Sequence, residues 1–169
     1  AYPTKTISPI PDTNGTYGLN DELETTTTYD LNTGLPLTVT DPNGAVTSME
    51  YDDPLLRSTK VTTGYGTALA AETITEYGAG TSASTRWVRV KSQIDDTNWK
   101  EGYSWFDGLG RAVKSQSVNT AGDVFSLTCY DSVGRVSKVS NPFRNVSNPT
   151  CSTTTGLDWT TKTYDSAGR

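Results

Sequence analysis

Tyr130-Asp131-Ser132-Val133-Gly134-Arg135 is the stretch that decides the fold, because the chain repeats it twice more. It recurs upstream as Phe106-Asp107-Gly108-Leu109-Gly110-Arg111 and downstream as Tyr164-Asp165-Ser166-Ala167-Gly168-Arg169. Looser copies begin at Tyr29-Asp30 and at Tyr51-Asp52. Each unit of such an array is one supersecondary element that must pack against its neighbours to bury an apolar face. The sequence is therefore more informative about architecture than about activity.

Each copy of the motif has the chemistry of a β-turn between two strands. The aromatic residue ends one strand, and the Asp carboxylate accepts hydrogen bonds from backbone N–H groups two residues further on. Gly supplies a backbone conformation with positive φ, and Arg begins the returning strand. We expect Asp131 to pair either with Arg135 or with the Arg of an adjacent repeat, so that the turn also carries a charge pair.

The repeated Tyr-Asp-x-x-Gly-Arg pattern resembles the YD-repeat family of large secreted and surface proteins, also called the RHS-repeat family. The resemblance covers almost the whole chain, from the Thr-rich segment before Tyr29 to the last residue. Two copies depart from the pattern, because Leu35 stands where Arg is expected and the copy from Tyr51 to Arg57 has no Gly. Tyr77-Gly78 is a further decayed copy that lacks Asp.

Turn signals of a second kind alternate with the Tyr-Asp turns, and Asp41-Pro42-Asn43-Gly44 is the clearest of them. Similar signals occur at residues 95–98 and 119–122. Only 33% of the residues are hydrophobic, and the many Thr and Ser residues suit strands with one solvated face. The sequence therefore predicts an all-β fold, a continuous antiparallel meander of β-hairpins without a helical segment.

Residues 1–22 differ from the rest, because three prolines precede Asn14-Gly15 and block regular ladder formation except at a sheet edge. We predict a Pro/Gly-rich extended arm over residues 1–22, followed by the hairpin array over residues 23–169. The arm is either a terminus that follows the surface or a strand donated to a neighbouring unit. Asn-Pro pairs indicate a loop insertion in the array at about residues 141–158. Since the chain starts without Met and stops at the end of a motif, we expect a piece of a longer protein.

Residues 86–106 allow a detailed prediction of register. If residues 95–98 form a hairpin loop, Ile94, Val90 and Val88 face Trp99, Tyr103 and Trp105 on one side of the sheet. Arg89, Lys91 and Lys100 are then expected on the opposite side. This arrangement predicts an apolar face around the three aromatic side chains.

Cys129 and Cys151 are the only cysteines, and the chain contains no His. Neither cysteine can therefore belong to a Cys–His catalytic pair or to a mixed Cys/His zinc site. The resemblance to secreted repeat proteins, with the Thr-rich composition and the single Met, favours an oxidising compartment and a disulfide between them. Two separate buried thiols are the alternative.

Composition and motifs argue against several classes of function. The net charge of −5 and the absence of a basic patch disfavour nucleic acid and anionic membranes as partners. No apolar run is long enough for a membrane-spanning helix. Phosphate-binding loops, hydrolase motifs and metal-ligand clusters are missing from the sequence, so we expect no enzyme activity, no cofactor and no metal.

The resemblance implies a structural role. Members of the YD/RHS family build a ribbon of β-hairpins that spirals into a hollow shell, so this chain is expected to be a non-enzymatic segment of such a secreted or cell-surface scaffold, including toxin shells. Its expected partners are further repeats of the same parent chain or identical subunits joined through edge strands. A fibre subunit assembled by edge pairing is one alternative. The other is a glycan-binding adhesin that uses Trp99, Tyr103 and Trp105, although we expect these rings to pack inside the protein.

Overall fold

The computed structural model describes residues 2–18, 21–78, 86–144, 146–152 and 154–168 of the 169-residue chain. Regular structure in these residues consists of β-strands joined by turns, with no helix. The strands are β1 (Lys5–Ser8), β2 (Leu23–Tyr29), β3 (Pro36–Thr40), β4 (Val46–Glu50), β5 (Lys60–Thr63), β6 (Ala71–Gly78), β7 (Arg86–Gln93), β8 (Trp99–Phe106), β9 (Ala112–Ser117), β10 (Val124–Tyr130), β11 (Val136–Ser140) and β12 (Trp159–Thr161).

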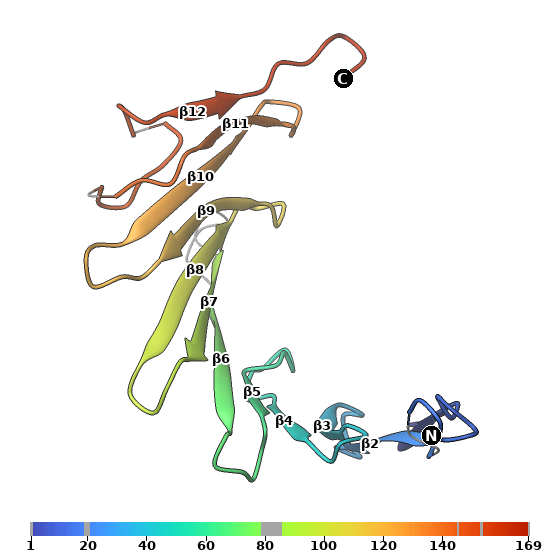
Figure 1. The fold of residues 1–169 in the computed structure, drawn as a ribbon. Helices are drawn as coiled ribbons and strands as arrows, with labels where there is room; N and C mark the ends of the chain where they lie inside the picture. Colours follow the sequence, from blue (N-terminus) through green and yellow to red (C-terminus); the bar gives the residue numbers. More distant parts are fainter. Residues whose placement is uncertain (1, 19–20, 79–85, 145, 153, 169) are drawn as a thin grey trace. The chain divides into compact units, whose positions relative to one another are not determined.

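The strands form one sheet in which spatial order follows chain order from β1 to β12 (Figure 1). Neighbouring strands are antiparallel, since consecutive strands joined by short turns must reverse direction. The prediction of an all-β antiparallel meander is confirmed. The described residues contain no helix long and apolar enough to cross a membrane.

Residues Ala1–Ile74 and Ser92–Asn98 make up a first compact unit, which carries a row of hydroxyl side chains across its strands. Thr28, Thr38, Ser48 and Thr62 are paired in register across strands β2 to β5. The Oγ1 atoms of Thr28 and Thr38 are 2.6 Å apart, and the side chains of Ser48 and Thr62 are buried. Within the predicted arm, residues 5–8 form β1 and pair with β2 at the end of the strand order.

Residues Thr75–Lys91 and Trp99–Arg169 make up a second unit, which contains a small apolar core around β10. Leu127 has 1% of its surface exposed, and Cys129 and Pro149 are also buried. The segment between β11 and β12 runs beside β10, because Phe143 bridges to Phe125 and the two rings lie 6.1 Å apart. Leu127 also donates its backbone N–H to Ser140 Oγ. The segment between β11 and β12 thus covers the apolar side chains on one face of β10.

The predicted disulfide between Cys129 and Cys151 is present. It joins β10 to the segment between β11 and β12, over a sequence separation of 22 residues. The alternative of two separate thiols is therefore wrong. A disulfide is typical of proteins that fold in an oxidising environment.

The predicted face assignment of the β7–β8 hairpin is wrong. Lys91 lies 5.5 Å from the centre of the Trp99 ring, and Arg89 bonds to Glu101 and lies over Tyr103. These cations share the face of the aromatic residues, whereas Val90 and Ile94 are exposed. Because side chains alternate along a strand, a pairing shifted by one residue moves every side chain of β7 to the other face.

Candidate functional site

The turns at Asp107 and Asp131 have the same backbone geometry, which the motif residues create. In each turn Asp donates its N–H to the carbonyl of the motif Arg, and Gly donates its N–H to the carbonyl of Asp. Gly110 and Gly134 adopt φ values of 78° and 90°, a conformation that costs Gly little. The Asp carboxylate accepts from the backbone N–H two residues on and from that of Arg. The motif is thus a self-contained turn.

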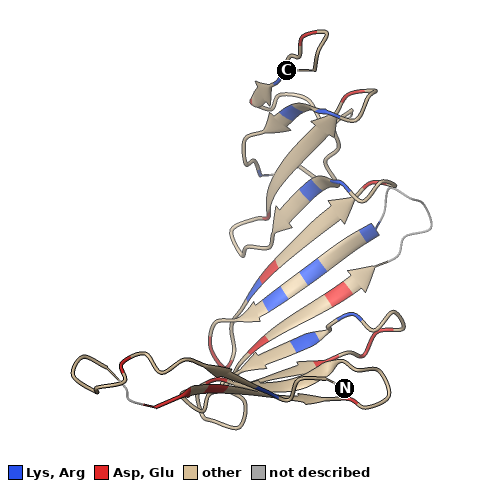
Figure 2. Cartoon of the chain, turned by 90° about the vertical axis from the view of Figure 1, so that its right-hand side faces the viewer, with Lys and Arg blue, Asp and Glu red and all other residues tan. Residues whose placement is uncertain are grey.

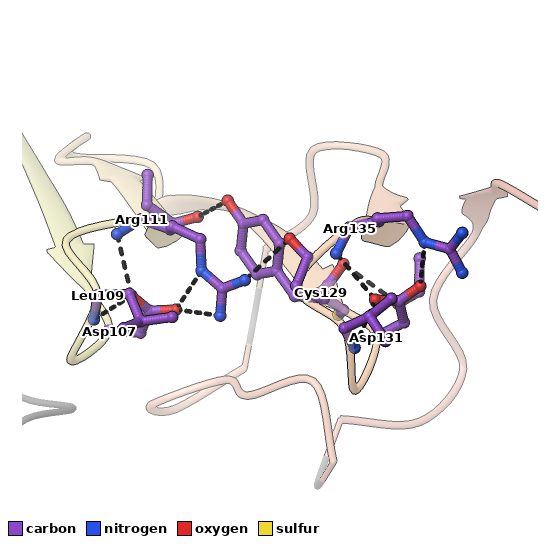
Figure 3. A network of polar contacts seen from close by, with 11 residues as sticks. Asp107, Leu109, Arg111, Cys129, Asp131 and Arg135 are labelled. Carbon is purple, nitrogen blue, oxygen red and sulfur yellow. Dashed lines mark hydrogen bonds and ion pairs between the residues drawn. The ribbon is translucent and has the colours of Figure 1, made fainter. Parts of the chain in front are cut away.

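Arg111 and Arg135 each turn back to the Asp of their own turn, as Figure 3 shows. The Nε atoms of Arg111 and Arg135 each lie 2.8 Å from a carboxylate oxygen of Asp107 and Asp131. Backbone hydrogen bonds from the Arg residues, together with these side-chain bonds, lower the pKa of both carboxyls. The expected charge pair is therefore within the turn.

The same Arg also reaches the next repeat. The Arg111 guanidinium lies 4.1 Å from the centre of the Tyr130 ring, and its Nη1 donates to the carbonyl of Gly134 at 2.9 Å. In return, the Tyr130 hydroxyl donates to the carbonyl of Ala112 at 3.0 Å. We call this two-way contact the clasp. In a clasp, the guanidinium of one Arg lies over the Tyr ring of the next repeat, and the hydroxyl of that Tyr donates to the carbonyl of the residue after the Arg.

A second clasp has the same geometry. Arg135 lies 4.3 Å from the centre of the Tyr164 ring, and the Tyr164 hydroxyl donates to the carbonyl of Val136 at 2.8 Å. A Cβ atom on Gly168 would lie 3.7 Å from the Arg135 guanidinium, so the Arg of one turn again passes the Gly of the next. The clasp therefore explains why both residues recur together in the motif.

The first copy makes a variant of the clasp with an aromatic side chain in place of Arg. The ring of Tyr2 stacks on that of Tyr29 at 5.1 Å, and the Tyr29 hydroxyl donates to the carbonyl of Pro3 at 3.0 Å. The Tyr2 hydroxyl occupies the position that a Cβ atom on Gly34 would need. Asp30 caps its turn by accepting from the N–H groups of Asn32 and Thr33.

The copy predicted at Tyr51-Asp52 uses the following Asp instead. Asp53 accepts from the N–H groups of Leu55 and Arg57 and pairs with the Arg57 guanidinium at 2.7 Å. Leu56 takes the left-handed position with a φ of 56°, which is unusual for a residue other than Gly. The sequence pattern placed this copy at residues 51–57 with Asp52 as the motif Asp, and it did not predict the roles of Asp53, Leu56 and Arg57, because the copy has no Gly. The four-residue spacing from Asp to Arg, shared with Asp107 and Arg111, was the signal that identifies this turn.

Asp41 forms the same type of backbone turn between β3 and β4, at the opposite ends of the strands from the Asp30 turn. Its carboxylate accepts from the N–H groups of Asn43 and Ala45, and Gly44 donates to the Asp41 carbonyl. This turn was expected to belong to a separate class, but its local geometry matches that of the Asp107 turn. The difference is that Ala45 replaces Arg, so the turn has no guanidinium to extend to a neighbour.

The aromatic residues singled out in the sequence lie half-buried on β8 among rings and cations. The Tyr103 ring is 5.7 Å from that of Trp87 and is stacked 5.4 Å from that of Trp105. Lys114 Nζ lies 3.9 Å from the centre of the Trp105 ring. Trp99 lies apart from this stack and contacts Lys91.

Figure 2 colours the acidic and basic residues on the neighbouring strands β6, β7 and β8, and three of these residues form an ion-pair network. Arg89 lies between Glu76 and Glu101, at 3.0 Å and 2.8 Å from their carboxylate oxygens. The hydrogen bond to Glu101, followed by that to Glu76, raises the pKa of Arg89. These carboxylates neutralise the charge of Arg89. The residues that the structure describes contain no cluster of Asp, Glu or Cys side chains that could hold a metal ion.

Comparison with known proteins places the second unit in a family. A search of curated proteins finds no match to this chain. A family model described as a domain of unknown function, DUF6443, matches residues 80–169, which are more than half of the chain and include all three close copies of the motif. The chain therefore belongs to the DUF6443 family.

Proposed function

We propose that this chain is a non-enzymatic structural segment of a secreted or cell-surface scaffold of the YD/RHS-repeat kind. The observation that carries the proposal is the clasp, in which the Asp107 and Asp131 turns each contact the following Tyr-Asp turn through Arg and Tyr. Its function is to link successive hairpins into a continuous β-ribbon. The partners are further repeats of the same parent chain or identical subunits.

The chemistry of the motif supports a mechanical role over a catalytic one. Asp107 and Asp131 each accept from two backbone N–H groups and from their own Arg. A carboxylate held in this way has a lowered pKa and is a poor general base or acid at neutral pH. The motif residues thus stabilise the turn, and the repeated turns link the hairpins of the array.

The disulfide supports the proposed location. It joins the insertion to β10 in a chain whose apolar core is small, a situation in which secreted domains rely on cross-links. By resemblance to YD/RHS proteins, the parent protein is a β-shell that encloses cargo or a wall-associated scaffold. At this length the chain contributes only part of one turn of such a shell.

The arrangement of the aromatic rings disfavours a stacking platform for sugars on β8. The Trp105 ring already contacts the Tyr103 ring and the Lys114 ammonium group, which occupy the faces that a sugar would need. The side chains of Trp105 and Tyr103 are therefore assigned to packing. Trp99 contacts the ammonium group of Lys91 instead of a second aromatic ring.

The experiment that tests the structural role is the substitution Trp105→Ala. It removes a half-buried ring that contacts Tyr103 and Lys114, so we expect the free energy of unfolding to fall by about 2 kcal/mol or more. Urea unfolding and glycan-array binding are measured on the same protein. An unchanged unfolding free energy together with loss of binding to a neutral glycan would establish the adhesin function instead.

A fibre subunit is the second candidate, because β1 is exposed along its whole length at the end of the strand order. Such an edge can pair with a strand of another chain. Removal of residues 1–22 tests this function by light scattering across a concentration series. A fibre subunit loses its higher assemblies on truncation, whereas a shell segment gives the same mass before and after, apart from the deleted residues.

A further inference from the structure

Two grooves flank the contact between β9 and the insertion in the second unit. One, of about 540 Å³, lies over Leu127 and the disulfide and is bordered by Asn148, Pro149 and Ser152. The other, of about 530 Å³, lies towards Phe125 and contains Asp123. Trp105, Lys114 and Asn148 line both grooves, so these three residues form the ridge between them. Volumes of this size fall in the range of small-ligand sites, about 300–1,000 Å³.

Among the described residues that line the first groove, Lys114 is the one that carries a charge. Its ammonium group lies over the Trp105 ring and donates to Asn148 Oδ1 at 3.0 Å, and within the described part of the chain it forms no ion pair. Partial burial lowers its pKa, which reflects loss of hydration without a compensating anion. Arg89 and Arg111, by contrast, each pair with a carboxylate.

The backbone at the groove is held in an uncommon conformation. Asn148 has a φ of 44°, in the left-handed region that few residues other than Gly adopt. The next residue, Pro149, is fully buried, and Cys151 is fixed by the disulfide to β10. Asn tolerates this region better than most residues with a side chain, so it suits this position. The side-chain amide of Asn148 therefore lies on the ridge, beside the ammonium group of Lys114.

The remaining lining of the first groove indicates the class of ligand. Its accessible apolar floor is formed by Val113 and Tyr130, because Leu127 and Pro149 beneath it are almost fully buried. Its rim carries the hydroxyls of Thr150 and Ser152, which lie 3.3 Å apart. A pyranose ring has an apolar C–H face and several hydroxyls, which match this floor and rim. A carboxylate on the sugar would supply the anion that Lys114 lacks. In the second groove the carboxylate of Asp123 would repel the same ligand.

We propose that the groove over Leu127 and the disulfide binds an acidic saccharide, whose carboxylate pairs with Lys114 and whose hydroxyls bond to Asn148 and the Thr150–Ser152 rim. Recognition in this site depends on charge and hydrogen bonding in the groove. It is independent of the structural role of the ribbon and does not need an open face on Trp105.

The test uses the full chain and trigalacturonic acid, with the fully methyl-esterified trimer as the neutral ligand of the same shape. Calorimetry and shifts of the Trp105 indole N–H signal in NMR spectra measure binding. We expect the acid to bind at least about tenfold more tightly than the ester, as a charge-assisted hydrogen bond implies. 3′-Sialyllactose and lactose serve as a second acidic and neutral pair.

Variants separate the ammonium group from the packing of its stem. Lys114→Met should weaken binding of the acid by about tenfold or more, and Lys114→Arg should retain most of it. Lys138→Met is the matched control, because Lys138 lies 4.0 Å over Trp159 in the same geometry but lines neither groove. Asn148→Gly keeps the left-handed backbone and should also weaken binding, which gives a second readout if Lys114→Met does not fold.

Four results would overturn the proposal. The first is no binding of either acidic sugar, and the second is equal binding of acid and neutral counterpart. The third is a loss in Lys138→Met as large as that in Lys114→Met. A triglutamate peptide that binds as tightly as trigalacturonic acid would also reject the saccharide, since the groove would then recognise any carboxylate. Each of these outcomes leaves the structural role of the ribbon unaffected.

Discussion

The guanidinium of Arg111 lies 4.1 Å from the centre of the Tyr130 ring, and the Tyr130 hydroxyl bonds to the carbonyl of Ala112, the residue after Arg111. Two residues 19 positions apart in sequence are thus joined in both directions. Arg135 and Tyr164 repeat the relationship. The sheet hydrogen bonds pair each strand with the next, whereas these two clasps each join one Tyr-Asp turn to the following Tyr-Asp turn. Its contribution to stability can therefore be measured separately.

Arg111→Gln should lower the free energy of unfolding by about 1–3 kcal/mol. The change removes the cation over Tyr130 and the charged hydrogen bond to the Gly134 carbonyl. Arg111→Lys should be nearly as damaging, because an ammonium group cannot bond to Asp107 and Gly134 while lying flat on the ring. Urea unfolding followed by tryptophan fluorescence measures both. Lys5→Gln, which breaks the exposed pair with Glu24, is the control and should cost less than about 1 kcal/mol.

Tyr130→Phe should cost about 0.5–1.5 kcal/mol, because it leaves the Ala112 carbonyl without the hydroxyl but keeps the ring under Arg111. Tyr17→Phe is the control, since Tyr17 is 96% exposed. A double-mutant cycle of Arg111→Gln with Tyr130→Leu then isolates the ring contact. Additive effects of the two substitutions would show that Arg and Tyr stabilise the turns independently, and the clasp would not be a unit.

Acid should destabilise the protein between about pH 4 and pH 2. The pKa of Asp53 is lowered to about 2 chiefly by its side-chain bond to Arg57, and that of Asp95 to about 2 chiefly by Asn98. Since an unfolded Asp has a pKa of about 3.9, the unfolded state binds more protons in this window. The contribution is fully present above the unfolded pKa and is lost as pH falls through the folded value.

Urea midpoints at pH 5, 4, 3 and 2 measure this loss. Asp53→Asn removes one titrating group and should flatten the decline, while lowering the midpoint at pH 5. A decline that is identical in wild type and Asp53→Asn would contradict the assignment of the carboxylate to the turn.

The sequence predicted the fold and the turns well because both depend on local signals. Asp, Gly and Arg at fixed spacing specify the Asp107 and Asp131 turns without reference to the rest of the chain. The turn at Asp53 was misplaced because Leu56 adopts a backbone conformation that its own side chain disfavours, and only the surrounding structure selects it.

Contacts between elements were harder to predict. The face of β7 was wrong because a shift of one residue in a hairpin loop reverses every side chain, and Asp95 to Asn98 admits more than one loop geometry. The clasp and the ridge at Lys114 were not predicted, since each depends on residues from separate repeats. The Lys114–Asn148 bond in particular spans 34 positions and requires the path of the insertion.

The disulfide should stabilise the protein by about 2–4 kcal/mol, as is usual for a loop of this size. Alkylation without reductant, followed by intact-mass measurement, should detect no free thiol. The double substitution Cys129→Ser with Cys151→Ser should lower the free energy of unfolding and release the insertion from Leu127, which hydrogen exchange at the Leu127 amide reports. Equal exchange protection with and without the disulfide would show that the Ser140 bond and Pro149 hold the insertion by themselves.

Glycine substitutions distinguish the turn from the clasp. Gly44, Gly110 and Gly134 all have positive φ, so replacement by Ala should cost each turn about 1 kcal/mol. A new Cβ atom meets nothing within 4 Å at Gly44 or Gly110, but at Gly134 it would lie 2.9 Å from the Arg111 guanidinium. Gly134→Ala should therefore cost more than the other two, and the excess should vanish when Arg111→Gln is added. Unfolding free energies of the three single variants and the double variant decide this, and an excess that persists without the guanidinium would mean that Arg111 does not pass over Gly134 in solution.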